Sequence, residues 1–420
     1  MADSNWDVMR RLRENWLAVA CAGVGVWSMV YLGLYGFAWT DYDFEATPSY
    51  DALTAGHVWR FFELAPAYGG SLELRAPFAL LPGLWGGGEQ AVYELVGLVC
   101  LIAGGLLGLW LFGRLRKLGA TRLARWTALG LCAANPVTIY ACQIGHPEEL
   151  LGAVLCVAAL LAARGKRVVW AGLLLGLAIV NKEWALIAIG PVLLALPAHR
   201  WRALAIAAAT ATVFYAPLMI AQWTAHTTPS PVALSGTGSI FQPWQIWWFL
   251  GATGHVVRNS NGVILHGYRE APAWLSGLTH PLIVLLGVPL TLLAARQGRR
   301  REGSGDALLL LVALLLVRCV LDPWDDVYYL LPFIIALVSW ESLERRRPPL
   351  LGLIATFATW AVFEALPANT SADARSAIFL ALALPALIAL GLAIYAPRTL
   401  SRASRRWTAP ARIQPSQAWR

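Results

Sequence analysis

The chain has 420 residues, of which 58% are hydrophobic and only 14% charged, and its mean hydropathy is +0.57. This composition excludes a soluble globular protein, whose chain usually carries about 25% charged residues. The net charge of +9 does not indicate a nucleic-acid partner, because the basic residues are confined to short segments between long apolar runs.

Lysine and arginine gather in seven short segments, which hold 26 of the 33 basic residues. These segments are 10–13, 114–125, 164–167, 200–202, 296–301, 345–347 and 398–420. Of the 24 acidic residues, seven lie in the stretches that flank these segments, and the other 17 lie elsewhere. The seven are Asp3, Asp7, Glu14, Glu302, Asp306, Glu341 and Glu344. Such segregation is typical of a multi-pass membrane protein whose basic turns stay in the cytoplasm. We therefore expect both termini, including the basic tail 398–420, on the cytoplasmic side of the cell membrane, and an acidic outer face.

The apolar runs between these turns predict twelve helices. Their expected bounds are 16–38, 91–112, 126–141, 148–163, 168–181, 184–197, 203–222, 279–295, 307–321, 327–343, 350–366 and 376–396. The helices 126–141, 168–181 and 184–197 are shorter than the about 20 residues that cross a bilayer. Short or broken helices persist in a membrane where protein or a watery cavity satisfies their ends. We expect an all-α, polytopic transmembrane bundle that forms one integral membrane domain over residues 1–420.

Two long outer loops interrupt the series of helices. In the first, 39–90, Thr47 and Pro48 begin a stretch that has one apolar side as far as Leu64, which predicts a helix lying on the membrane surface. In the second, 223–280, the run 241–250 is rich in aromatic residues and suits the membrane–water interface. We expect both loops to carry interfacial helices.

Three carboxylates follow the first apolar run directly: Asp41, Asp43 and Glu45. A helix that has crossed the bilayer delivers its last residues to the boundary with water, where a carboxylate stays ionised within reach of a lipid head group. We interpret the three as the catalytic acid cluster of an enzyme that acts on a lipid-linked substrate, with Asp41 as the first candidate. The alternative is that they only solvate a loop.

Two cations, Lys182 and Arg318, lie at the ends of apolar runs. A cation inside a membrane costs about 3 kcal/mol unless it is paired, so each is a candidate for binding. A phosphate is one suitable partner. The alternative is an internal carboxylate, and the candidates are Glu183, Asp322, Asp325 and Asp326.

Six polar side chains are expected to line a cavity that opens outward: His146, Glu148, Glu149, Asp322, Asp325 and Asp326. Their oxygens could hold a divalent cation, but no spacing fixes such a geometry. The plainer alternative for the last three is helix capping and pairing with Arg318. We predict neither a metal nor a cofactor.

Several motifs share the outer side and follow one another in order along most of the chain. They are Asp41-Tyr42-Asp43, Tyr68-Gly69-Gly70-Ser71 with Arg75-Ala76-Pro77, Asn135-Pro136, Gly145-His146-Pro147-Glu148-Glu149, the run from Gly172 to Lys182-Glu183-Trp184, and Asp322-Pro323-Trp324-Asp325-Asp326-Val327-Tyr328-Tyr329. Together they resemble the GT-C superfamily of membrane transferases that use polyprenyl-phosphate sugars. Within it the chain is most similar to glycosyltransferase family 87, a bacterial group of mannosyltransferase-like proteins.

The resemblance implies a hexosyltransferase that moves a sugar, mannose, from a polyprenyl-phosphate donor to a lipid or glycan acceptor of the cell envelope at the outer face. Asp41 would deprotonate the acceptor hydroxyl, while Lys182, Arg318 or Arg75 would stabilise the leaving phosphate. Membrane lipids are expected partners. The alternative is a twelve-helix transporter or a lipid-handling protein, although the two long outer loops have no counterpart in a matching half of the chain.

Overall fold

The computed structural model describes residues 2–35, 41–226, 239–258, 264–298 and 305–396. The predicted basic tail 398–420 and the first two residues of the first outer loop, Trp39 and Thr40, lie outside these ranges. Nearly all regular structure within them is helical, which confirms the predicted all-α class. The described chain also forms one short antiparallel sheet from β1 (Ile240–Phe241) and β2 (Arg269–Glu270).

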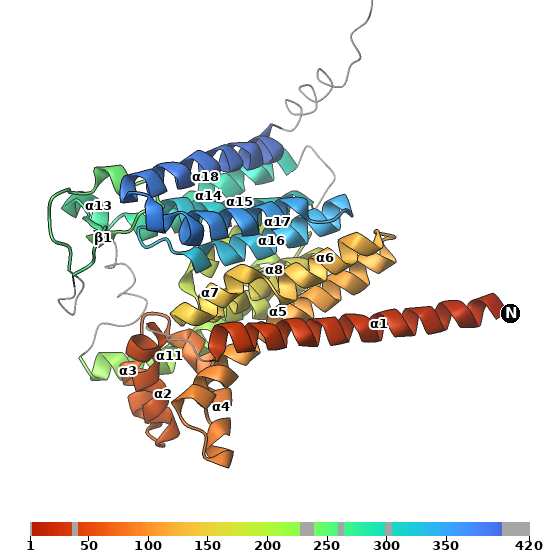
Figure 1. Ribbon diagram of the computed structural model, residues 1–420, viewed down its shortest axis with the longest axis horizontal. Coiled ribbons are helices and arrows are strands. Elements are labelled where there is room, and N and C mark those ends of the chain that lie inside the picture. The colour runs from red at the N-terminus through yellow and green to blue at the C-terminus, as the bar shows by residue number, and fades with distance from the viewer. Residues whose placement is uncertain (1, 36–40, 227–238, 259–263, 299–304, 397–420) are drawn as a thin grey trace, which may run out of the picture.

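Helices of very different lengths build the fold (Figure 1). In chain order the α-helices are α1 (Ala2–Met29), α2 (Thr47–Thr54), α3 (Val58–Leu64), α4 (Gly69–Ala79), α5 (Glu89–Lys117), α6 (Arg122–Ala133), α7 (Pro136–Ile144), α8 (Glu148–Arg164), α9 (Val168–Asn181), α10 (Ile189–Ala195), α11 (Arg200–Thr224), α13 (Ala273–Ser276), α14 (Thr279–Gly298), α15 (Gly305–Leu321), α16 (Leu331–Trp340), α17 (Leu350–Trp360) and α18 (Ala372–Tyr395). Short π-helical segments occur at Val30–Leu34, Tyr42–Ala46, Glu341–Arg345 and Ala361–Ala365. Short 3₁₀ segments occur at Leu81–Trp85, Glu183–Ala188, Trp248–Leu250, Val327–Leu330 and Pro367–Asn369.

Six helical segments in the described chain are long and apolar enough to cross a membrane. They are Leu12–Leu34, Glu89–Lys117, Arg200–Thr224, Thr279–Gln297, Val327–Arg345 and Ala372–Tyr395. Shorter apolar helices accompany them at Val168–Asn181, Glu183–Ala195, Ala307–Leu321 and Leu350–Ala365. Short helices beside full-length ones are the arrangement that the sequence predicts.

Burial separates an inner helix from outer ones. In the segment Val327–Arg345, which contains α16, 83% of the apolar window is buried, whereas the value is 17% for α11 and for α18. Figure 1 shows α18 at the edge of the bundle and α8 and α16 inside it. Long apolar surfaces like those of α11 and α18 are stable against lipid rather than water. The chain is therefore a multi-pass membrane protein.

α8 lies in the middle of the bundle. It packs against α5, α9 and α16, and alanine and leucine make up much of its buried surface. It begins at Glu148, near the end of the bundle where α2, α3 and α4 lie, and ends at Arg164 at the opposite end (Figure 1). Both ends of this one helix carry charged residues.

Two segments that were predicted as single helices are each divided. The predicted helix 126–141 is α6 and α7, because Pro136 has no N–H to continue a helix and Asn135 Oδ1 accepts a hydrogen bond from Val137 N at 3.0 Å to begin a new one. The predicted surface helix from Thr47 is α2 and α3, which separate at Gly56, where φ is +83°.

Two further predicted bounds were wrong. The first helix, expected over 16–38, begins at Ala2, and its π-helical extension ends at Leu34. The helix expected over 184–197 is a 3₁₀ segment, Glu183–Ala188, followed by α10. The tighter 3₁₀ turn allows the chain to reverse beside Lys182, where the backbone is extended.

The first outer loop packs against the bundle through buried aromatic rings. Tyr42 and Tyr50 stack with their centroids 6.2 Å apart, and Tyr50 lies 6.1 Å from Phe61. Tyr42 also lies 4.3 Å from Tyr93 of α5. These contacts hold the π-helical segment Tyr42–Ala46 against the bundle.

The aromatic run 241–250 only partly faces outward. Trp248 is 2% exposed, and its Nε1 donates a hydrogen bond to Asp373 at 2.8 Å. Phe249 and Leu250 are 52% and 51% exposed and are the members that suit an interface.

Candidate active site

The turn between α7 and α8 brings the first outer loop next to His146. Gly145 ends α7 with φ +107°, a left-handed conformation that favours glycine. A Cβ at Gly145 would lie 2.5 Å from the backbone nitrogen of Tyr42, so only glycine lets the two segments approach this closely. The approach places Asp41, the residue before Tyr42, beside His146.

His146 connects an accessible carboxylate to a buried one. Its Nε2 lies 3.3 Å from Asp41 Oδ2, and its Nδ1 lies 2.8 Å from Glu148 Oε1. The Asp41 side chain is 41% exposed, whereas that of Glu148 is fully buried. The rings of Tyr68 and Tyr328, with centroids 5.2 Å and 4.7 Å from that of the imidazole, hold it in place. The result is a chain of charges from the surface to the interior.

All three cations predicted to bind phosphate converge on the first two residues of α8. Arg75 Nη2 lies 3.3 Å from Glu148 and Lys182 Nζ lies 3.1 Å from the same carboxylate. Arg318 makes two hydrogen bonds to Glu149, at 3.1 Å and 3.2 Å. The Lys182 side chain is 11% exposed, against 3% for each of the two arginines. Lys182 is therefore the most accessible cation of the three.

The internal partners of Lys182 and Arg318 differ from those suggested by the sequence. Their closest carboxylates are Glu148 and Glu149, whereas Glu183 accepts a hydrogen bond from the Tyr215 hydroxyl at 3.1 Å. The two glutamates thus lie beneath the site as counter-ions. Three permanent cations face these two carboxylates, and the charge of Glu45 also acts on Lys182.

Neutral side chains of the family motifs, for which the sequence predicts no role, support this cluster. Ser71 donates a hydrogen bond to Asn181 at 3.0 Å, and Asn181 donates one to the backbone oxygen of Glu148 at 2.9 Å. Lys182 Nζ stands 4.0 Å above the ring of Tyr68. Tyr68 and Ser71 belong to the motif Tyr68-Gly69-Gly70-Ser71, and Asn181 lies in the run from Gly172 to Lys182. This position within the motifs is their signal in the sequence.

The two other carboxylates of the predicted acid cluster lie at the surface. Asp43 and Glu45 both belong to the π-helical segment Tyr42–Ala46 and are exposed. Burial, followed by the charge of Glu45, raises the pKa of Tyr68. Glu45 therefore acts on the Tyr68–Lys182 side of the cluster, and Asp41 on the His146 side.

The three carboxylates that follow α15, Asp322, Asp325 and Asp326, have different surroundings. Asp322 pairs with His280 at 3.4 Å, and Asp325 is fully buried without a hydrogen-bond partner among the described residues. Asp326 caps the 3₁₀ segment Val327–Leu330 through Val327 N at 2.6 Å. Burial, together with the charge of Asp41, raises the pKa of Asp326 to about 6. Within the described ranges, no three His, Cys, Asp or Glu side chains form a site that could hold a metal ion.

The charge state of His146 follows from these neighbours. Burial and the charge of Lys182 lower the pKa of His146, but Glu148 and Asp41 outweigh them and raise it to about 9. The imidazole is therefore protonated at neutral pH. It forms ion pairs with carboxylates on both sides.

We expect the protein to lose stability as the pH rises from 6.5 to about 9. These limits are the ordinary pKa of histidine and the raised pKa of His146 in the folded state. The stabilisation is complete below the lower value and is lost as the imidazole deprotonates. In His146→Gln, the unfolding temperature should change little with pH between these two values. In the control His57→Gln, at an exposed position, the unfolding temperature should still fall as the pH rises. An equal decline in both variants would contradict the assignment.

Comparison with known proteins adds one finding. The family model of glycosyltransferase family 87 matches residues 70–323. This range contains α8 and the cations on α4, after α9 and on α15, and it ends one residue after Asp322. No curated protein matches the chain.

Proposed function

Because the chain belongs to glycosyltransferase family 87 and is a membrane glycosyltransferase, we propose that it takes its sugar, mannose, from a polyprenyl-phosphate donor. The acceptor is a lipid or glycan of the cell envelope. In this proposal the reaction takes place on the outer face, and both termini lie in the cytoplasm. The single observation that carries the proposal is the link from accessible Asp41 through His146 to the buried cluster around Glu148.

Asp41 is the proposed general base. Its carboxylate is the accessible member of the chain of charges, so an acceptor hydroxyl can reach it, whereas Glu148 is fully buried. The contact with His146 fixes the orientation of Asp41. A positioned base of this kind contributes about 10²–10⁴-fold to a rate.

The proposed reaction is a single displacement. The acceptor oxygen attacks the anomeric carbon of the donor sugar while its proton moves to Asp41. The bond between that carbon and the phosphate oxygen breaks, and polyprenyl phosphate leaves with the bonding electron pair. Lys182 stabilises the negative charge that develops on the phosphate, because it is the most accessible of the three cations in the cluster.

A lipid-linked donor suits the surface beside this cluster. α11 packs against α9, which ends next to Lys182, and also against α3 and α4. Its outward side is apolar: Val213 is 70% exposed, Ile220 55% and Trp223 75%. A prenyl chain could lie along this surface while its phosphate reaches the cluster.

Lys182→Gln is expected to lower kcat/KM for the donor by roughly 10–150-fold, the loss of about 1.5–3 kcal/mol from one charge-assisted hydrogen bond. Lys182→Arg should restore most of the activity because it keeps the charge. The control Lys166→Gln, at an exposed position on the turn after α8, should match the native rate. Native activity in Lys182→Gln would remove this residue from phosphate binding.

The reaction class can be tested with purified protein in liposomes that contain polyprenyl-phosphate mannose and membrane lipids. The expected result is a mannosylated product extracted with the lipids. Uptake of a soluble solute without any sugar transfer would instead favour the transporter alternative.

A further inference from the structure

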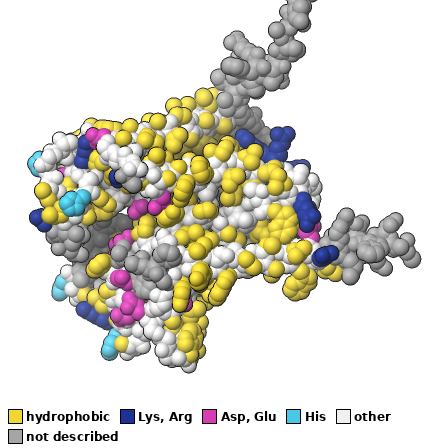
Figure 2. Space-filling view, in the orientation of Figure 1, with side chains coloured by type: hydrophobic (Ala, Val, Ile, Leu, Met, Phe, Trp, Pro, Cys, Tyr) yellow, Lys and Arg dark blue, Asp and Glu magenta, His cyan; other side chains and the backbone are white. Residues whose placement is uncertain are grey.

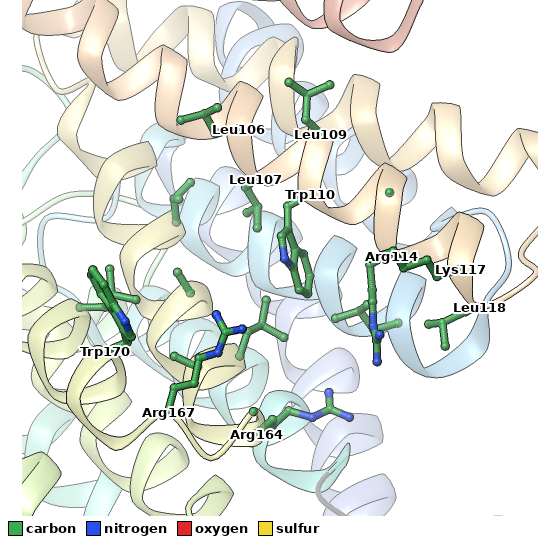
Figure 3. A pocket seen from close by; sticks show the side chains of 18 of the residues that line it. Leu106, Leu107, Leu109, Trp110, Arg114, Lys117, Leu118, Arg164, Arg167 and Trp170 are labelled. Atoms are coloured by element: carbon green, nitrogen blue, oxygen red, sulfur yellow. The ribbon is translucent and has the colours of Figure 1, made fainter. Parts of the chain in front are cut away.

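A groove with basic and apolar walls lies at the end of α8 opposite the candidate active site. It is bounded by α5, the end of α8, the start of α9 and the segment Glu341–Arg345 (Figure 3). Its volume is ≈ 1350 Å³, which exceeds the roughly 300–1,000 Å³ of pockets for drug-sized ligands. At a rise of about 1.5 Å per residue, α8 separates Arg164, which lines the groove, from Glu148 by roughly 24 Å.

One part of the lining is apolar. It includes Leu106, Leu107, Leu109, Leu161 and Leu174. Trp110 and Trp170, which also line the groove, are 46% and 59% exposed. Indoles at helix ends are typical of the membrane–water interface. This part of the lining can therefore contact acyl chains.

The other part of the lining is strongly basic. Its cations are Arg114, Arg116, Lys117, Arg164, Arg167 and Arg346. The groove contains one acidic residue, Glu344, which pairs with Arg164 at 2.7 Å. Arg116 donates a hydrogen bond to the neutral side chain of Asn15. Among the described residues, five of the six cations thus have no acidic partner, and Arg164 is the exception. Figure 3 shows Arg114 on α5 and Arg167 before α9 on opposite sides of the groove.

Helix capping explains only some of these cations. Arg114, Arg116 and Lys117 lie in the last turn of α5, where positive charge complements the helix dipole. Arg167 lies before the first turn of α9, where the dipole disfavours a cation, and Arg346 follows a different segment. Their convergence on one groove therefore indicates an anionic ligand.

We propose that this groove binds an anionic phospholipid of the surrounding membrane. Its phosphate lies between Arg114, Lys117 and Arg167, and its acyl chains follow the leucine and tryptophan side chains. Arginine forks suit phosphate oxygens, and basic pockets between membrane helices hold anionic head groups. A free phosphate would leave the apolar part of the lining without a ligand. This site is separate from the proposed donor site at the other end of α8.

The test is native mass spectrometry of the full chain in detergent, titrated with phosphatidylglycerol or with phosphatidylethanolamine that has the same acyl chains. The groove variant carries Arg114→Gln, Lys117→Gln and Arg167→Gln. A matched control carries Arg122→Gln, Arg202→Gln and Arg345→Gln, which removes three charges near the same end of the bundle but outside the groove lining.

We expect the groove variant to bind phosphatidylglycerol about 100-fold more weakly than the native protein, and Arg167→Gln alone about fivefold more weakly. The control should stay within about twofold of the native affinity, and phosphatidylethanolamine should bind all forms alike. The single variant keeps the test decisive if the triple variant does not fold. Equal losses in the groove and control variants, or displacement of the lipid by millimolar inorganic phosphate, would overturn the proposal.

Discussion

Replacing Asp41 with asparagine is expected to reduce sugar transfer by about 10²–10⁴-fold while the protein is produced and folds normally. Asparagine has nearly the same shape and can keep its contact with His146, which lies 3.3 Å from Asp41 in the native protein. It cannot accept the proton of the acceptor hydroxyl. The measurement is the initial rate of mannose transfer at saturating donor and acceptor.

The neighbouring carboxylates supply the control for this prediction. Asp43→Asn and Glu45→Gln each remove one negative charge from the π-helical segment that follows Asp41, and both side chains are exposed. We expect Asp43→Asn to keep at least about a tenth of the native rate, because general-base catalysis accounts for a larger factor. If Asp41→Asn kept the native rate, Asp41 would have no part in the mechanism.

Replacing Glu148 with glutamine is expected to produce the largest loss of stability, about 3–5 kcal/mol, because it leaves buried charges without their counter-ion. Glu148 is fully buried and serves Arg75, Lys182 and His146 at the same time. The measurement is the free energy of unfolding in mixed detergent micelles at neutral pH.

A surface ion pair provides the matched control for Glu148→Gln. Glu344 pairs with Arg164 at 2.7 Å, and their side chains are 30% and 23% exposed. Glu344→Gln should cost under about 1 kcal/mol, because solvent screens such a pair. Comparable losses in the two variants would show that the buried cluster does not depend on Glu148.

The sequence predicts the membrane class and the end of the bundle where the polar groups gather. In the face shown in Figure 2, the visible histidine side chains lie on one side of the molecule, together with most of the visible acidic ones. The segregation of charge along the chain is sufficient to predict this end of the bundle. Successive helices run in opposite directions, so turns of like charge return to the same end. The motifs around Asp41, His146 and Lys182 meet there for the same reason.

The pairing inside the cluster could not be predicted from the sequence. The rule that a buried cation needs a partner is correct for Lys182 and Arg318, but neighbours in sequence are poor guides to that partner. The 3₁₀ turn after Lys182 directs Glu183 toward Tyr215, and the start of α8 brings Glu148 and Glu149 to the cations instead. These arrangements depend on turns whose geometry is set by packing.

The breaks in two predicted helices have a local cause that periodicity hides. Apolar residues continue across Asn135 and Pro136, so the hydrophobic pattern alone predicts one helix. The proline and the capping asparagine override that pattern. The break lets α7 turn toward the first outer loop, and this positions Gly145 and His146.

The choice of donor tests the central claim most directly. Purified protein in liposomes should be given polyprenyl-phosphate mannose in one reaction and nucleoside-diphosphate mannose in another, with the same acceptor lipids. We expect transfer from the polyprenyl-phosphate donor alone, and loss of that transfer in Asp41→Asn. Transfer from the nucleotide sugar at an equal or higher rate would contradict the account.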